Sequence, residues 1–196
     1  MSDNPDHLGG RLPLADPATL TGAQREIFDQ MTRTVVPLAE RAGFQSTTAD
    51  GRFVGPFNPC LLNPAISEQF LQLQFTEAQH TSLSERARQV VILTVGAVWH
   101  AGYELYAHSA AARHAGLPEA AIATLVGGGL PDDLTEQEKI AYRLARALST
   151  SHHVDDQLYR EAEKAFGAKG VLEITALTGI YHTVCGILNV FDVPAP

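Results

Sequence analysis

The sequence is poor in cysteine and in lysine. Its two cysteines, Cys60 and Cys185, lie far apart, and no Cys-x-x-Cys pair occurs. This spacing excludes a disulfide scaffold, a thioredoxin-like redox motif and a zinc site built from cysteine pairs. The three lysines, Lys139, Lys164 and Lys169, lie among polar residues in the last third of the chain. Because Schiff-base and pyridoxal mechanisms need a lysine inside a pocket, we expect neither chemistry here.

Positive charge is scarce as well. The chain has 14 Lys and Arg against 22 Asp and Glu, which gives a formal net charge of −8. Nucleic-acid binding relies on clustered basic residues, so we expect no nucleic-acid partner. The most apolar stretch, Val90–Trp99, is about half of the ~20 residues that a membrane span needs. The polar, acidic first residues do not resemble a signal peptide, and we expect a cytoplasmic protein with no membrane partner.

Nucleotide-binding glycine motifs are absent too. Neither G-x-G-x-x-G nor G-x-x-x-x-G-K-[ST] occurs, and the Gly127-Gly128-Gly129 run has no lysine after it and predicts a turn. We therefore expect no cofactor. Hydrophobic residues make up 45% of the chain, enough for a substantial core. The Gly- and Pro-containing residues 1–20 predict an N-terminal arm, and residues 21–193 predict a single domain.

Helical periodicity dominates the rest of the chain. Ser82–Glu85 and Thr135–Glu138 both have the pattern of a capping box, and Gly116 suits a left-handed helix end. Val90-Val91-Ile92 could form a buried strand, but no alternating partner or hairpin turn accompanies it. We expect an all-α protein of about seven helices. The clearest of them run over residues 22–41, 83–114, 119–126, 135–148, 155–167 and 171–191. Gly102 leaves open a break or kink within the second of these.

A loop rich in glycine, proline and aromatic residues separates the first helix from the others. It spans Gly43 to Pro64 and carries Phe53 and Phe57. Linkers seldom contain so much apolar area, so the loop is expected to be ordered. Two interpretations remain open: a cover over the core, or a loop that faces a substrate.

One acidic residue stands alone in an apolar helix. Glu104 is the only carboxylate between Glu85 and Glu119. On a continuous helix, His100 and His108 would lie one turn before and one turn after it, on the same face. A buried acid is costly unless it is paired or protonated. A neighbouring histidine would pair with it and provide an acid/base group that works near neutral pH.

The same stripe has two other interpretations. A structural helix pair at a subunit surface would have the same spacing. A metal could also use His100, Glu104 and His108 as ligands. One straight helix presents three ligands poorly to a tetrahedral metal, however, and the sequence marks no fourth ligand. We therefore expect no metal site.

Four segments resemble the carboxymuconolactone decarboxylase family, whose members are similar in fold to alkylhydroperoxidase D. The most specific is Tyr103-Glu104-x3-His108-x4-Arg113-x2-Gly116-Leu117. The others are residues 51–57, residues 83–93 and the ending from Gly179-Ile180-Tyr181 to Leu188-Asn189-Val190-Phe191. This resemblance implies an alkylhydroperoxidase-D-like helical bundle that assembles into homotrimers or homohexamers.

The sequence departs from the peroxidase branch of that family. The two cysteines of the branch are replaced by Ala101 and Glu104, so no thiolate can attack a peroxide. Gln89 stands where the branch has a proton-relaying glutamate, and an amide cannot titrate. The resemblance instead implies a cofactor-independent lyase of the decarboxylase type. Its substrate would be a small enolisable molecule with a carboxylate or a lactone.

The predicted site combines this resemblance with the stripe. We expect His108 to act as the acid, Glu104 to orient it and His100 to share the work. Residues expected to bind the substrate are Tyr103, Arg86, Gln89, Phe57 and His182, with Arg88 as an alternative to Arg86. Solvated helix-start arginines and a core or interface histidine are the competing interpretations.

Two other functions remain open. One is a different reaction at the same site, such as hydrolysis, isomerisation, ring closure or retro-aldol cleavage of a secondary metabolite. The other is a non-catalytic oligomeric binding protein. That function predicts that the stripe is fully packed at a subunit contact, with no adjoining cavity.

Overall fold

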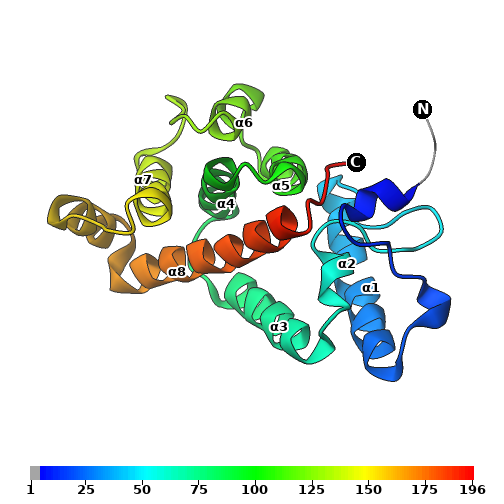
Figure 1. Ribbon diagram of the computed structural model, residues 1–196. Helices are drawn as coiled ribbons and strands as arrows, with labels where there is room; N and C mark the ends of the chain where they lie inside the picture. The colour runs from blue at the N-terminus through cyan, green and yellow to red at the C-terminus, as the bar shows by residue number, and fades with distance from the viewer. Residues whose placement is uncertain (1–4) are drawn as a thin grey trace.

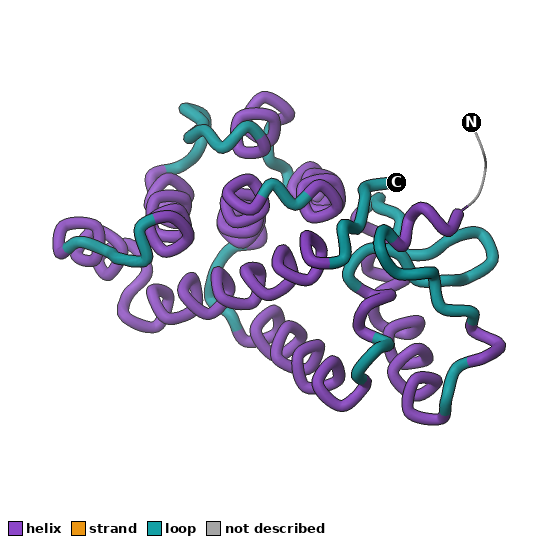
Figure 2. The backbone as a smooth tube through the Cα atoms, in the orientation of Figure 1, coloured by secondary structure: helices purple, strands orange, loops and turns teal. Residues whose placement is uncertain are grey.

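The computed structural model describes residues 5–196, which form an all-helical bundle without a β-strand (Figures 1 and 2). This confirms the predicted fold class. Two short 3-10 helices, Pro5–Gly9 and Pro17–Thr19, precede eight α-helices. The α-helices are α1 (Gly22–Ala42), α2 (Phe57–Cys60), α3 (Pro64–His80), α4 (Glu85–Trp99), α5 (Gly102–His114), α6 (Glu119–Val126), α7 (Glu136–Thr150) and α8 (Asp156–Val190).

Helix α4 is the centre of the C-terminal half. Helices α5, α6, α7 and α8 surround it, and every residue from Gln89 to Ala97 is buried. A helix enclosed in this way is apolar on nearly every face. This enclosure explains why the Val90–Ile92 run has the composition of a buried strand although it lies in a helix.

Helix α8 runs between α3 on one side and α4–α7 on the other, and its C-terminal end points toward α1 and α2 (Figure 1). Gly167, with φ of 68°, interrupts it where the sequence predicts the end of one helix. By length and composition, α8 resembles a membrane span. In the fold it is a core helix, since Ile174 and Leu177 are fully buried together with residues of α4 and α7.

The helical run predicted over residues 83–114 consists of two helices, and the break lies next to Gly102, where the sequence leaves a break or kink open. The chain turns at His100, which has a left-handed φ of 52°, and α5 starts at Gly102. The His100 N–H donates to the Ala97 carbonyl, and the Ala101 N–H donates to that of Gly96, which ends α4. At Gly96 an added Cβ would lie 3.3 Å from Glu104 Cγ. The missing side chain therefore lets α5 approach α4 closely.

The predicted helix starts are partly confirmed. Thr135 and Glu138 form the expected capping box. The box predicted at Ser82 is wrong, because Ser84 is the N-cap of α4. The Ser82 hydroxyl donates instead to Glu173 on α8, at 2.6 Å.

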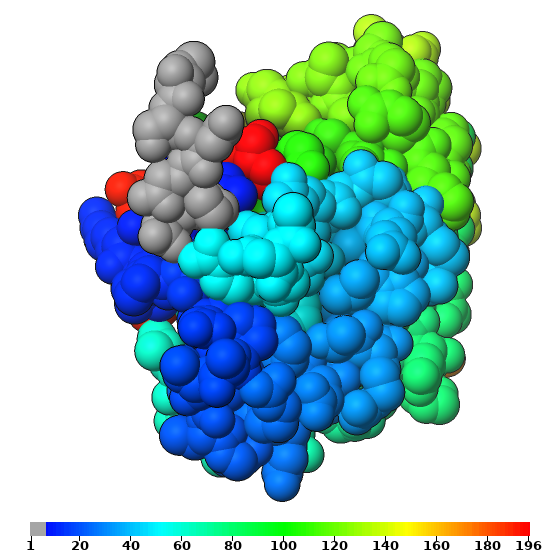
Figure 3. Space-filling model, turned by 90° about the vertical axis from the view of Figure 1, so that its right-hand side faces the viewer, coloured from blue at the N-terminus to red at the C-terminus, as the bar shows by residue number. Residues whose placement is uncertain are grey.

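The N-terminal arm packs onto the domain. Leu8 and Leu14 are buried in one cluster with Tyr103 and Leu188. The Arg11 N–H donates to the Phe191 carbonyl at 2.7 Å, which joins the two ends of the chain. In the space-filling view, the arm, α1 and the following loop cover one side of the molecule (Figure 3).

Gly55 fixes this loop against the site, and its replacement by alanine is expected to be costly. It has φ of 66°, and an added Cβ would overlap the ring of buried Tyr103. Left-handed strain and overpacking together should cost roughly 3 kcal/mol of unfolding free energy. Gly51→Ala is the matched control, because φ is 81° and the space beside it is open. Urea unfolding of both variants measures the difference, and equal losses would refute a steric role.

Candidate active site

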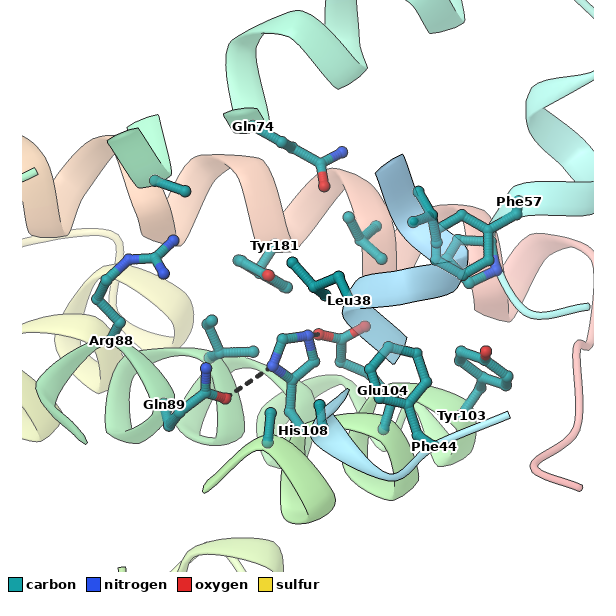
Figure 4. A pocket seen from close by; sticks show the side chains of 18 of the residues that line it. Leu38, Phe44, Phe57, Gln74, Arg88, Gln89, Tyr103, Glu104, His108 and Tyr181 are labelled. Carbon is teal, nitrogen blue, oxygen red and sulfur yellow. Dashed lines mark hydrogen bonds and ion pairs between the residues drawn. The ribbon is translucent and has the colours of Figure 1, made fainter. Parts of the chain in front are cut away.

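A cavity of about 420 Å³ lies between α1, α3, α4, α5 and α8 (Figure 4). Its volume lies within the range of small-molecule sites. Most of the wall is apolar. Among the apolar residues of the wall are Val35, Leu38, Phe44, Phe57, Phe70, Leu71, Phe75, Ile92, Ala107, Val184 and Ile187.

Glu104 is the buried acid of this cavity. It lies in the first turn of α5, and only 2% of its surface is exposed. Burial raises its pKa to about 8, because the ionised form loses its hydration. Its Oε1 atom makes no hydrogen bond of good geometry. Near neutral pH, Glu104 is therefore largely a neutral carboxylic acid with an unsatisfied oxygen.

His108, one turn later, faces the same cavity. Its Nε2 lies 3.2 Å from Glu104 Oε1, and its ring packs perpendicular to that of Tyr181 in a T-shaped arrangement with centroids 5.1 Å apart. Burial, and next the nearby Arg88 cation, lower the pKa of His108 to about 3. His108 is therefore a neutral imidazole, so the pair joins a neutral acid to a neutral base.

The tautomer of His108 follows from a hydrogen-bond chain along α4. The Gln89 Nε2 amide donates to Glu85 Oε1 at 2.7 Å, which turns Gln89 Oε1 toward the histidine. This oxygen lies 2.8 Å from His108 Nδ1 and can only accept, so Nδ1 carries the proton. Nε2 is then the unprotonated nitrogen that faces Glu104.

Replacing Glu85 should weaken the preference of His108 for the tautomer that is protonated at Nδ1. In Glu85→Ala the Gln89 amide is free to rotate, and the loss of roughly 1 kcal/mol of preference should shift the tautomer ratio about fivefold. ¹⁵N imidazole shifts of His108 report the ratio directly. Glu136→Ala, at the same position of α7, is the control because Glu136 pairs only with Lys139. An unchanged His108 spectrum in Glu85→Ala would contradict this role.

Arg88 lies at the same end of the cavity, but its charge is already paired. Its Nη2 lies 2.6 Å from Glu77 Oε2 and its Nη1 lies 3.2 Å from Glu85 Oε2. The Glu77 side chain is only 7% exposed. Arg88 Nε and Glu77 Oε1 have no hydrogen-bond partner. This network pairs the Nη1 and Nη2 atoms of the guanidinium and leaves its Nε–H without a partner.

Five of the predicted site residues line the cavity together: Glu104, His108, Gln89, Tyr103 and Phe57. The ring of Tyr103 forms part of the wall, while its hydroxyl donates to the Gln45 carbonyl at 2.6 Å and holds the loop after α1. Phe57 begins α2 and also lines the wall. The loop thus both covers the core and faces the cavity.

Three predicted residues lie elsewhere. His100 is exposed at the turn between α4 and α5, so it does not share a helical face with Glu104. Arg86 forms a salt bridge with Glu138 on α7, at 2.7 Å, and does not reach the cavity. His182 Nε2 lies 2.8 Å from the Ser149 hydroxyl, on the side of α8 that faces α7. Each prediction assumed a helix face or a free side chain that the packing does not provide.

Metal and thiol chemistry find little support in these residues. No group of three His, Cys, Asp or Glu side chains within residues 5–196 is arranged to hold a metal ion. Cys60 lines the cavity and Cys185 is buried nearby, and both are free. Burial raises the pKa of both thiols, which keeps them protonated and unreactive.

Sequence reasoning missed part of the site. Glu85 has a recognisable signal in its Glu-x-x-x-Gln spacing to Gln89 on α4. Glu77 and Tyr181 have none, because α3 and α8 reach the cavity only through the tertiary fold.

Comparisons with known proteins show a family match for part of the sequence and similar folds among solved structures. The sequence model of the carboxymuconolactone decarboxylase family matches residues 64–147. A search of curated proteins gives no match. The fold is similar to that of a peroxidase-related protein of Ralstonia eutropha with an alkylhydroperoxidase AhpD core. That structure has a TM-score of 0.75 and 17% identity, over 95% of this chain and 92% of the other.

Two further solved structures share the fold. A variant of the debrominase Bmp8 in complex with 2,3,4-tribromopyrrole has a TM-score of 0.70 and 18% identity, over 91% of this chain and 93% of the other. A putative antioxidant defence protein AhpD of Agrobacterium tumefaciens has a TM-score of 0.65 and 20% identity, over 71% of this chain and 96% of the other.

Proposed function

Because residues 64–147 match the model of the carboxymuconolactone decarboxylase family, we propose that the protein is a cofactor-independent lyase that moves a proton at a carbon atom. The substrate is a small enolisable compound that carries a carboxylate or a lactone. The observation that carries this proposal is the Glu104–His108 pair, a neutral acid beside a neutral base in an apolar cavity.

The two residues divide the proton transfer, with roles opposite to those predicted from the sequence, where His108 is the acid and Glu104 orients it. The raised pKa of Glu104 and the lowered pKa of His108 support this exchange. His108 Nε2 accepts a proton from the substrate, since its Nδ1–H is held by Gln89. The Glu104 carboxyl donates a proton to the oxygen or carbon on which negative charge develops. A pKa of about 8 keeps this acid protonated near neutral pH, close to the value that favours general acid catalysis.

Decarboxylation is the lyase form of this chemistry. The bond between the carboxylate and its neighbouring carbon breaks, CO2 leaves, and the electron pair remains as a dienolate. Glu104 then returns a proton to carbon and is reprotonated through His108 or water. The guanidinium of Arg88, which lines the same cavity, can stabilise the charge of the dienolate.

A second candidate function is isomerisation, ring opening or retro-aldol cleavage without loss of CO2. The observation that favours it is the pairing of Arg88 with two carboxylates, which leaves the inner cavity without a free cation for a substrate carboxylate. The cavity itself argues against a non-catalytic binding protein, whose Glu104 and His108 would be packed without adjoining space.

Deuterium incorporation tests the proposal. The purified protein is incubated in D2O with α-angelica lactone and, separately, with an unsaturated lactone acid. The expected result is enzyme-dependent deuteration at carbon, seen by NMR. A product lighter by the mass of CO2 would identify the decarboxylase, whereas an unchanged skeleton would identify an isomerase. No deuteration above the rate of the Glu104→Gln/His108→Ala double variant would refute both.

The pH profile of kcat/KM is a further expected result. Activity needs protonated Glu104 and should fall about tenfold per pH unit above its pKa of about 8. His108 stays neutral down to about pH 3, so no acidic limb is expected between pH 5 and 7. Rate measurements between pH 5 and 10 test both statements. An acidic limb near the usual pKa of histidine would contradict the geometry.

We also propose that the chain forms homo-oligomers. Several large apolar side chains are exposed on the outer faces of α3 and α8, namely Ile66, Leu73, Leu172 and Val190. Exposed apolar side chains mark a subunit contact where they form one contiguous patch, so the mass in solution rather than these side chains decides the proposal. Light scattering coupled to gel filtration gives the mass, and a strict monomer would contradict this proposal.

A further inference from the structure

The charges around the reacting pair do not suit an anionic ligand. Glu77 and Glu85 provide two carboxylates against the single guanidinium of Arg88. Glu104 and His108 add no positive charge, because both are neutral. Glu77 alone already neutralises Arg88 in the buried part of the network, while Glu85 is 55% exposed and therefore screened by water. An anion that entered this end would lose its hydration and find no free cation to pair with.

The polar groups of the cavity wall indicate which hydrogen-bonding groups a ligand would bring in place of a negative charge. Glu104 in its neutral form and the guanidinium of Arg88 both line the cavity and can donate to an acceptor, whereas Glu77, whose Oε1 is also unpaired, is not among the lining residues. Leaving buried donors unpaired is costly, so a ligand that brings acceptor oxygens is favoured. The rest of the wall, dominated by aromatic and aliphatic side chains such as Phe44 and Phe70, suits an apolar body.

We propose that the cavity takes an uncharged, largely apolar ring compound whose carbonyl or lactone oxygens accept hydrogen bonds from Glu104 and Arg88. This inference rests on the proposed function. It narrows the substrate from a compound with either a carboxylate or a lactone to an uncharged compound such as a lactone. It favours proton transfer on a lactone or ester over loss of CO2 from a free carboxylate.

Arg41 is the remaining arginine of the cavity wall. It lies in the last turn of α1 and its side chain is exposed to solvent. An exposed cation attracts a ligand carboxylate weakly, because water and salt screen it. Arg41 therefore does not provide a desolvated cation next to Glu104.

Three probes of the same shape test the charge preference: methyl phenylacetate, phenylacetate and phenethylamine, which are neutral, anionic and cationic at neutral pH. Calorimetry or ligand-observed NMR with the wild-type protein gives their affinities. We expect the neutral ester to bind at least about tenfold more tightly than either charged probe. Equal or tighter binding of a charged probe would overturn the proposal, as would no detectable binding of the ester.

Two substitutions show whether binding occurs in this cavity. Ala111→Phe fills the wall of the cavity from α5 and should abolish binding of the ester. Ala123→Phe, on the exposed face of α6, is the matched control and should leave it unchanged. Binding that survives Ala111→Phe would place the ligand elsewhere and overturn the inference.

Glu77→Gln tests the electrostatic cause. It removes one of the two carboxylates from Arg88, so the preference for the ester over phenylacetate should shrink about threefold or more. An unchanged ratio would show that this network does not set the preference. These assays measure binding alone. Failure of the charge preference therefore leaves the deuteration result intact, and absence of deuteration leaves the affinities interpretable.

Discussion

Glu104→Gln is expected to lower turnover by a factor of about 10² or more, on whichever lactone the wild-type protein deuterates. The amide keeps the shape of the side chain but has no acidic proton to donate, and general acid–base catalysis contributes roughly 10² to 10⁴ in rate. Binding of methyl phenylacetate should persist, because the cavity is unchanged. The measurement is kcat and KM by NMR, with the effect expected in kcat.

His108→Ala should give a loss of similar size, since it removes the base that lies 3.2 Å from the acid. The double variant should be little worse than either single variant, because the two residues act as a unit. His182→Ala is the matched control: this histidine is bonded to Ser149 outside the cavity and should leave the rate within about threefold. Near-normal rates in both Glu104→Gln and His108→Ala would refute the assignment of these two residues as the acid/base pair.

The reacting pair could be predicted because it depends on local spacing. Glu104 and His108 are four residues apart within one helix, and their separation survives any arrangement of the other helices. The same reasoning failed for His100, because it assumed a helix that continues through residues 100–102, although Gly102 signals a break there. The helix stops there because His100 adopts a left-handed φ while α5 folds back on Gly96.

The sequence could not show which of two arginines, Arg86 or Arg88, lies at the cavity. Arg86 and Arg88 are two residues apart at the start of α4 and look equivalent in the sequence. Helical geometry sends them to different neighbours, Arg86 to Glu138 on α7 and Arg88 to Glu77 on α3. Those carboxylates are distant in sequence, so neither pairing has a local signature.

Arg88→Met is expected to destabilise the protein by about 3 to 5 kcal/mol, because it leaves Glu77 buried without its cation. The double variant Arg88→Met/Glu77→Gln should recover most of that loss, since the uncompensated charge is then removed as well. Urea unfolding of the wild type, both single variants and the double variant completes the cycle.

Arg113→Met is the control for this cycle. Its salt bridge with Glu119 is exposed on both sides and should contribute less than about 1 kcal/mol. If the double variant is as unstable as Arg88→Met, the aliphatic packing of Arg88 rather than its charge stabilises the fold. A rescued double variant would show instead that the guanidinium is held to neutralise Glu77. The positive charge of Arg88 is then already neutralised by Glu77 and is not available to a ligand carboxylate. This pairing is the physical basis of the proposed preference for uncharged ligands.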